Sequence, residues 1–175
     1  YTYVVTNSNY TNIEIVDPYA KSTGVNGLRG MVVDFDDTDP EGWDEVEIHN
    51  YLATELTVYE THIADLTSSS TWTGTKENAK KLKGFYEEGT TYTENGVTVK
   101  TGFDHIKELG VNAVQILPFF DLANDEVNLS FNWGYNPLNY NALDGSYSSN
   151  PYDGYVKITE FKELVMAYNE AGINI

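Results

Sequence analysis

Residues 101–120, TGFDHIKELGVNAVQILPFF, join a short helix to an apolar strand through a single glycine. Apolar side chains recur in the helical part at helical spacing, at Phe103, Ile106 and Leu109. Thr101 is the expected N-cap, Asp104 stands at the capping-box position, and Gly110 is the expected stop. The nearly continuous apolar run after Gly110 is typical of a parallel strand covered on both faces. The stretch therefore predicts one unit of an α/β fold.

Similar elements lie on both sides of this stretch. Residues 55–66, ELTVYETHIADL, alternate in polarity and predict a strand. Residues 159–172 predict a helix that Thr159 caps and Gly172 ends, and another strand begins at Ile173. The apolar stripe of this helix is formed by Phe161, Leu164, Val165 and Tyr168. The order strand, helix, strand, helix, strand predicts a parallel sheet with right-handed crossovers.

The connections between these elements are very unequal in length. Each helix-to-strand link is little more than a glycine, whereas each strand-to-helix link has about 38 residues, against a usual 2 to 6. Long loops at the carboxyl ends of parallel strands are where α/β folds place their binding sites. We therefore expect a ligand to bind at this end of the sheet.

The part of the chain before residue 46 differs in character. Residues 1–16 predict two antiparallel strands joined by the polar turn TNSN. Residues 17–45 are rich in turn formers and acidic side chains, which indicates a linker and a domain boundary near residue 45. The apolar run that starts at Ile173 resembles a strand cut short, so we expect the chain to be part of a longer protein.

Composition excludes several classes of function. The chain has 27 acidic and 10 basic residues, a formal charge of −17, which repels phosphate backbones and anionic membranes. We therefore expect neither nucleic acid nor a membrane as a partner. The absence of cysteine excludes disulfides, thiol catalysis and thiolate metal sites. The three histidines have no zinc-like spacing, and neither a G-x-S-x-G elbow nor a phosphate-binding glycine loop is present.

Residues 131–137, FNWGYNP, lie in the second long loop and place three aromatic rings close together. Flat rings suit sugars, because a pyranose stacks its C–H groups on an aromatic face while amides bond its hydroxyls. The neighbouring amides are those of Asn132, Asn136, Asn139 and Asn141. The alternative is that the rings only pack a long loop, which fits Trp133 better than Tyr135.

The pair of Glu60 and His62, and also Asp121, have both a functional and a structural interpretation. Glu60 and His62, on one face of the first strand, are either an acid/base pair or an internal hydrogen bond. Asp121, at the end of the second strand, is either catalytic or a solvated loop residue. In each case the structural interpretation is favoured.

An acidic segment before the predicted domain boundary matches some positions of a calcium-binding EF-hand loop but not all of them. Residues 34–45, DFDDTDPEGWDE, offer oxygen ligands at four EF-hand positions, at Asp34, Asp36, Thr38 and Glu45. Asp39 stands where the sharp turn requires glycine, and Pro40 follows it. A solvated linker is the better interpretation.

Together these segments resemble a known family. The runs VYETHIADLT, TGFDHIKELGVNAVQILPFFD, FNWGYNPLNYNALDGSYSSNPYDG and ITEFKELVMAYNEAGINI are similar to type I pullulanase, an α-1,6-debranching member of the α-amylase clan, glycoside hydrolase family 13. GVNAVQILP alone indicates the wider clan, whereas an NWGY segment followed by GSYS is characteristic of pullulanases.

The resemblance implies roles for individual residues. Tyr135 matches the family tyrosine that stacks on the sugar beside the scissile bond, and Trp133 and Asn136 accompany it as substrate-binding residues. Asn136 stands where the family has Asp, Asp144 where it has Glu, and Phe131 where it has Tyr. The family's catalytic Asp nucleophile, Glu general acid and transition-state Asp come from later strands. No catalytic residue and no metal ligand is therefore expected within this chain.

The resemblance also implies an architecture. Residues 1–18 would end an N-terminal β-sandwich of starch-binding type, and residues 19–45 would form a linker. Residues 46–175 would begin a (β/α)8 TIM-type barrel, truncated at its third strand. The remainder of the same barrel would be the partner of this segment.

The expected activity is retaining hydrolysis of α-1,6-glucosidic bonds in pullulan, branched starch or limit dextrin. The chain alone would be inactive. The resemblance implies no cofactor, although calcium stays open, and an extracellular or cell-surface, bacterial-type location. The alternatives are another amylase-clan enzyme, of branching or isoamylase type, and a non-catalytic α-glucan-binding piece.

Overall fold

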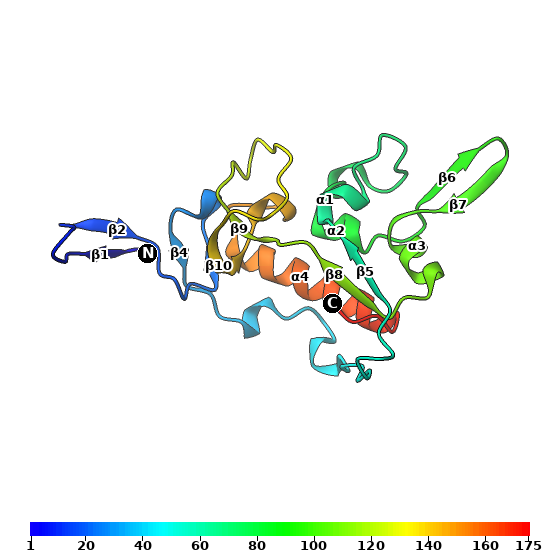
Figure 1. Cartoon of the computed structure of the whole chain (residues 1–175), viewed down its shortest axis with the longest axis horizontal. Helices are drawn as coiled ribbons and strands as arrows, with labels where there is room; N and C mark the ends of the chain where they lie inside the picture. The colour runs from blue at the N-terminus through cyan, green and yellow to red at the C-terminus, as the bar shows by residue number, and fades with distance from the viewer. The chain divides into compact units, whose positions relative to one another are not determined.

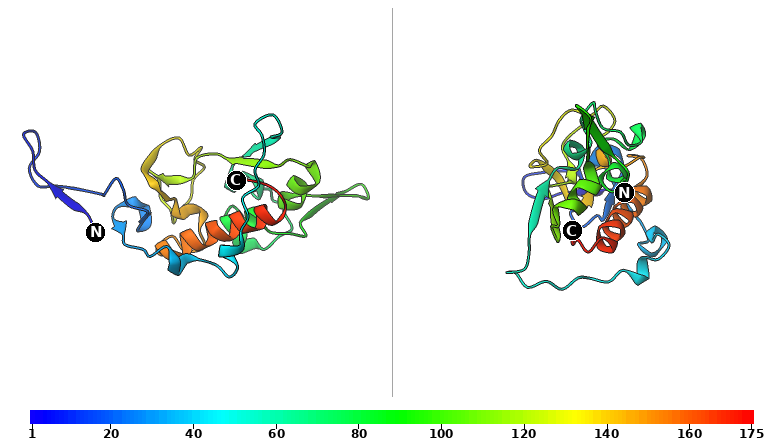
Figure 2. Two further views of the ribbon diagram at one scale, coloured as in Figure 1. Left: turned by 90° about the horizontal axis from the view of Figure 1, so that it is seen from below. Right: turned by 90° about the vertical axis from the view of Figure 1, so that its right-hand side faces the viewer.

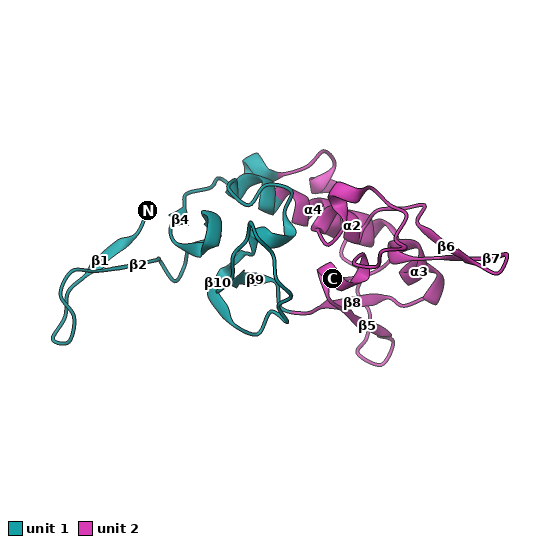
Figure 3. Ribbon diagram, turned by 90° about the horizontal axis from the view of Figure 1, so that it is seen from above, with its two compact units in different colours: residues 1–38, 118–158 teal, residues 39–117, 159–175 magenta.

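The computed structural model describes all residues 1–175 and divides them into two compact units (Figures 1 and 3). Unit 1 comprises Tyr1–Thr38 and Pro118–Ile158, and unit 2 comprises Asp39–Leu117 and Thr159–Ile175. Each unit is thus assembled from two stretches of chain. The long helix α4 (Gly154–Glu170), orange to red in Figure 2, has its first residues in unit 1 and the rest in unit 2 (Figure 3).

Unit 2 contains the predicted parallel strands. Strands β5 (Val58–Thr61) and β8 (Ala113–Ile116) pair in parallel with Val58 opposite Ala113. Asn174, one of the last residues of the chain, forms a further parallel bridge to Ala113. The predicted parallel order of strands is confirmed, with β8 between its two neighbours.

Helix α3 (Gly102–Leu109) confirms the helix predicted in the first half of residues 101–120. Gly110 ends it in the left-handed conformation, at a φ of 71°. The predicted capping box is wrong, because the Thr101 side chain makes no capping hydrogen bond. The carboxylate of Asp104 instead accepts the Gly89 N–H at 2.6 Å and pairs with Lys107 at 2.7 Å. It therefore fastens the preceding loop to the helix.

Helix α4 is longer at its start than the sequence predicted. Asp153 Oδ1 accepts the N–H of Tyr155 at 2.9 Å, so Asp153 rather than Thr159 caps the helix. On the predicted apolar stripe, Leu164 and Tyr168 are fully buried.

The core of unit 2 is centred on Tyr168. Its ring lies 5.5 Å from the ring of Phe85 and 4.5 Å from that of Phe103, centroid to centroid. Its hydroxyl donates to the Phe85 carbonyl at 2.9 Å. Three aromatic residues from different segments therefore meet at one buried point, and the one polar atom of Tyr168 is satisfied.

The strand predicted over residues 55–66 is wrong in its second half. The chain leaves the strand after Thr61, and residues Ile63–Leu66 form helix α1. His62 is the N-cap of this helix, and its Nδ1 accepts the Asp65 N–H at 3.4 Å. A local side-chain cap therefore overrides the alternating pattern.

The first long connection of unit 2 has secondary structure of its own. It contains η4 (Lys76–Asn78), α2 (Leu82–Phe85) and a hairpin of β6 (Thr91–Glu94) and β7 (Val97–Lys100). The hairpin turns at Asn95 and Gly96, which both have positive φ, as a two-residue turn requires.

Unit 1 begins with the predicted hairpin. Strands β1 (Tyr3–Val5) and β2 (Ile13–Ile15) pair antiparallel, which confirms the prediction for residues 1–16. Within residues 17–45, expected to be a linker, the chain forms short elements. They are β3 (Ser22–Thr23), η1 (Val25–Gly27), β4 (Gly30–Met31), η2 (Asp36–Thr38) and, in unit 2, η3 (Trp43–Glu45).

The second long connection of the chain forms the rest of unit 1. Strands β9 (Phe120–Leu122) and β10 (Pro137–Leu143) pair antiparallel with two register shifts, and η5 (Gly145–Tyr147) follows. The apolar run predicted as one strand over residues 111–120 is therefore divided, because β8 ends at Ile116. None of the helices is long and apolar enough to cross a membrane.

Candidate functional site

The aromatic segment 131–137 forms the loop between β9 and β10, and its three rings are exposed. Phe131, Trp133 and Tyr135 are exposed over 61%, 64% and 70% of their surfaces. Gly134 has a φ of 88°, and a Cβ there would collide with the Pro118 carbonyl oxygen. The backbone at Gly134 therefore lies close to Pro118, where only glycine fits, while the flanking rings are accessible to a ligand.

Trp133 does not pack inside the loop, so the expectation that it would is wrong. Its ring makes an edge-to-face contact with Phe131 at 5.5 Å and an interplanar angle of 83°. Tyr140, on β10, is likewise exposed and lies 5.9 Å from the Phe120 ring. Exposed aromatic side chains thus gather on this loop and its adjoining strands.

The four nearby asparagines hold the backbone. Asn132 Oδ1 accepts the Gly134 N–H at 3.0 Å, and Asn141 Nδ2 donates to the Pro18 carbonyl at 2.9 Å. Asn136 Nδ2 donates to the Ala123 carbonyl at 3.4 Å, and Asn139 is buried. These amides shape the loop, and Asn136 and Asn141 are also exposed enough to meet a ligand.

Asp121 is fully buried, so the expectation that it would be solvated is wrong. Strand β9 turns it into unit 1, where its Oδ2 accepts from Thr23 Oγ1 at 2.8 Å and from Asn139 Nδ2 at 2.7 Å. Its Oδ1 is buried without a hydrogen-bond partner. Burial raises the pKa of the Asp121 carboxyl to about 6, and the charge of Glu126 adds to the rise.

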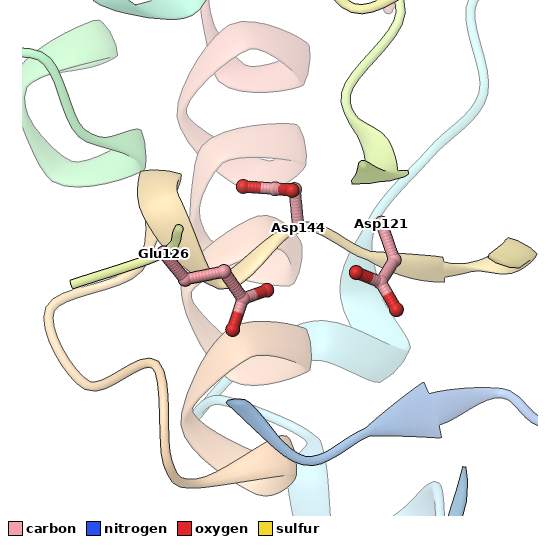
Figure 4. A group of neighbouring side chains, drawn as sticks. All are labelled: Asp121, Glu126 and Asp144. Atoms are coloured by element: carbon pink, nitrogen blue, oxygen red, sulfur yellow. The ribbon is translucent and has the colours of Figure 1, made fainter. Parts of the chain in front are cut away.

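Two further acidic side chains complete a buried cluster that the sequence did not predict. One carboxylate oxygen each from Asp121, Glu126 and Asp144 lies within 4.8 Å of the others. Figure 4 shows the carboxyl groups of Asp121 and Glu126 turned toward one another. All three residues are at most 3% exposed. We call them the carboxylate cluster.

Main-chain N–H groups orient two members of the carboxylate cluster. Glu126 accepts the N–H of Asn26 at 2.7 Å and of Gly145 at 2.5 Å. Asp144 accepts the N–H of Leu122 at 2.8 Å and of Ser146 at 2.8 Å, which makes it the cap of η5. The sequence signal for this role was an aspartate two residues before a serine, which is a common capping pattern.

Glu60 and His62 do not form the acid/base pair that was considered. Glu60 and His62 do not share a strand face, because β5 ends at Thr61 and His62 caps α1. Glu60 Oε2 accepts from Gln115 Nε2 at 3.0 Å on the neighbouring strand β8. Both side chains therefore have local structural partners, in line with the favoured interpretation.

The four EF-hand-like positions between residues 34 and 45 do not converge on one point as ligands. Asp34 Oδ1 accepts the Asp36 N–H at 3.2 Å, and Thr38 is buried with its hydroxyl donating to the Phe35 carbonyl at 2.6 Å. The acidic group with metal-like spacing is the carboxylate cluster instead.

Comparison with known proteins relates most of the chain to one group of enzymes. The pullulanase of Bacillus subtilis (strain 168) is 35% identical over 170 residues, which cover 93% of this chain and 22% of the relative. Pullulanase 1 of Arabidopsis thaliana, chloroplastic, is 28% identical over 199 residues, covering 91% and 19%. No protein-family model matches the chain.

Solved structures show a similarity to the same group of enzymes. The pullulanase of Paenibacillus barengoltzii, in complex with maltohexaose and α-cyclodextrin, is 40% identical with a TM-score of 0.83, covering 91% of this chain and 25% of that one. The chain is a homologue of part of the pullulanases. The pullulanase of Bacillus acidopullulyticus matches with 38% identity and a TM-score of 0.84, covering 94% and 20%.

Pullulanases are glycoside hydrolases, and the chain corresponds to a limited part of them. It spans between 20% and 25% of the two solved pullulanases and 22% of the Bacillus subtilis relative. The aromatic loop 131–137 and the carboxylate cluster both lie within unit 1. The loop is the accessible part of this region and the cluster is the buried part.

Proposed function

We propose that the chain is part of a starch- and pullulan-debranching enzyme that hydrolyses α-1,6-glucosidic bonds. The observation that supports this most is identity of 35% to 40% to pullulanases over more than 90% of the chain. In this proposal residues 1–18 end a β-sandwich module, residues 19–45 link it to the catalytic domain, and residues 46–175 begin a (β/α)8 barrel. The pairing of β5 with β8 and Asn174 suits the first three strands of such a barrel.

The catalytic groups lie outside this segment in the proposed enzyme. A retaining glycosidase uses two carboxyl groups roughly 5 Å apart, one as nucleophile and one as acid and base. The carboxylate cluster has similar spacing, but its residues are at most 3% exposed, so a sugar cannot reach them. The segment instead provides a wall of the substrate site.

Tyr135 is the central residue of that wall. It is the most exposed ring of the loop, at 70%, and Gly134 and Asn136 hold the backbone on either side of it. An exposed ring on a fixed backbone can stack on a sugar at little entropic cost. We propose that Tyr135 stacks on the sugar beside the scissile bond, with Trp133 and Asn136 next to it.

The proposed substrates are α-glucans: pullulan, branched starch and limit dextrin. The solved pullulanases include complexes with maltohexaose, maltotetraose and maltotriose, which supports an α-glucan as ligand. A polymer such as pullulan does not cross a membrane, so we propose an extracellular or cell-surface location.

The linkage that disappears from the substrate tests this function. The intact protein that carries this chain is incubated with pullulan and with linear α-1,4-glucan, and the products are analysed by NMR for α-1,6 and α-1,4 linkages. We expect loss of α-1,6 linkages alone. Loss of α-1,4 linkages would indicate another amylase-clan enzyme, and tight binding without hydrolysis would indicate a glucan-binding protein.

A further inference from the structure

Lys157 places a positive charge inside unit 1, against the carboxylate cluster. It lies in the first turns of α4, and its Nζ is 3.4 Å from Glu126 Oε1 and 3.2 Å from the Thr23 carbonyl oxygen. The Lys157 and Glu126 side chains are 1% and 0% exposed. A buried ammonium is tolerated only where carboxylates or carbonyl groups surround it. Lys157 is thus a cation built into the cluster.

The carboxylates do not depend on Lys157 for their positions. Glu126 and Asp144 together accept four main-chain N–H groups, those of Asn26, Gly145, Leu122 and Ser146. Asp121 is held separately by Thr23 and Asn139. We therefore expect the cluster to keep its geometry when the lysine side chain is replaced by a neutral one of similar length.

One oxygen of the cluster lacks a donor. Asp121 is 0% exposed, and its Oδ1 has no hydrogen-bond partner, although Oδ2 of the same carboxyl has two. Leaving a buried acceptor unpaired is costly. The Asp121 and Glu126 carboxyl groups are turned toward one another (Figure 4), so the unpaired oxygen of Asp121 is an available ligand in the cluster.

The spacing of the oxygens suits a calcium ion. Three oxygens, one from each residue, lie within 4.8 Å of one another. Calcium binds carboxylate oxygens at about 2.3 to 2.6 Å, so ligands on opposite sides of the ion are about 5 Å apart. The three oxygens therefore fit within a single coordination sphere.

We propose that the Lys157 ammonium takes the place of a divalent cation in the carboxylate cluster, and that removing it converts Asp121, Glu126 and Asp144 into a calcium site. The native protein then needs no metal ion at this point. Without the ammonium, three buried carboxylates have no cation beside them, and an ion with two positive charges and oxygen preference restores the balance.

The test compares Lys157→Met with the native protein, using the intact protein that carries this chain. Thermal unfolding is measured in EDTA and in millimolar Ca2+. We expect Lys157→Met to unfold at a lower temperature in EDTA and to recover with Ca2+, whereas this cluster gives no response in the native protein. Calorimetric titration should show Ca2+ binding at least about tenfold tighter in Lys157→Met.

Two further variants assign the effect to the cluster. Lys162→Met removes another buried lysine of α4, which pairs with Asp39 and lies 5.2 Å from the Trp43 ring. Since neither Asp39 nor Trp43 belongs to the carboxylate cluster, we expect this variant to be destabilised without rescue by Ca2+. Lys157→Met combined with Glu126→Gln should lose the rescue, because one ligand is gone.

Three outcomes would overturn the proposal. The first is a folded Lys157→Met variant whose unfolding temperature is the same in EDTA and in Ca2+. The second is a native protein that gains stability from Ca2+ through Glu126, because the ion would then bind beside the lysine. The third is a Lys157→Met variant that fails to refold with and without Ca2+ while Lys157→Arg folds. Recovery of Lys157→Met only when it is refolded in Ca2+ would support the proposal.

Discussion

At the scale of single residues, two polar side chains of similar shape in unit 1 have opposite environments. Asp121 is fully buried and Asn136, fifteen residues later in the chain, is exposed, although both were candidates for contact with a ligand. The sequence could identify Tyr135 and Trp133 as unusual, because three rings in seven residues fit no regular element. It could not separate buried from exposed carboxylates, since that depends on segments such as Thr23 that are distant in the chain.

Tyr135 and Trp133 should differ in their effect on turnover. We expect Tyr135→Ala in the intact enzyme to lower the rate on pullulan more than Trp133→Phe does. Loss of a stacking ring at the scissile sugar should cost on the order of 1 to 3 kcal/mol, or about 10- to 100-fold. Steady-state rates decide the matter, with unfolding temperatures as the control. Equal or inverted effects in two folded variants would discard the role assigned to Tyr135.

Asp121 should make stability depend on pH. Its pKa is raised to about 6 in the folded state by burial and by Glu126, whereas an unfolded Asp titrates near 3.9. As pH rises, the folded state therefore keeps the Asp121 proton to a higher pH than the unfolded state does. The stabilising contribution of this group is complete below about pH 4 and is lost as pH rises to about 6, which lowers the free energy of unfolding by about 3 kcal/mol. Lys157 and Asp144 also face Asp121 and are unchanged in the test.

The matched variant for this prediction is Asp121→Asn, which keeps the shape and cannot ionise. We expect its stability relative to the native protein to increase between about pH 4 and pH 6. Urea unfolding at a series of pH values measures this, and Asp37→Asn, at an exposed position, is the control. A stability difference that is constant over this range would contradict the assigned titration.

At the scale of elements, the sequence predicted what local patterns determine. Helices α3 and α4 and the hairpin of β1 and β2 are present because apolar spacing, stop glycines and a polar turn specify them. The strand after residue 55 was drawn too long, because alternation continues past Thr61 while the His62 cap ends it. The elements inside the long connections were missed, since they are short and held by contacts between distant segments.

Tyr168 tests whether α4 is held by its buried aromatic contacts. Tyr168→Phe removes only the hydrogen bond to the Phe85 carbonyl and should cost about 1 kcal/mol. Tyr168→Ala also removes the contacts with the Phe85 and Phe103 rings and should cost about 3 to 5 kcal/mol. Chemical denaturation of both variants measures the difference. Similar small losses would mean that the ring contributes little packing.

At the scale of the whole molecule, homology to pullulanases offers an explanation for the charge and the exposed apolar side chains, which the separate elements do not explain. A chain with a formal charge of −17 and 27 exposed large apolar side chains is suited to a neutral polymer as ligand and to further protein around it. We therefore propose the remaining barrel as its partner. Its carboxylate cluster, despite suitable spacing, is closed to substrate, which supports our proposal that the catalytic residues lie outside this segment.

Reducing-end release from pullulan tests the central claim most directly. The purified chain is assayed alone and again after the complementary piece of the enzyme is added. We predict no hydrolysis by the chain alone and recovery of activity on assembly, because the proposed function places both carboxyl groups of a retaining mechanism outside this segment. Substantial hydrolysis by the isolated chain, abolished by Asp121→Asn or another change to an acidic residue within it, would contradict the claim.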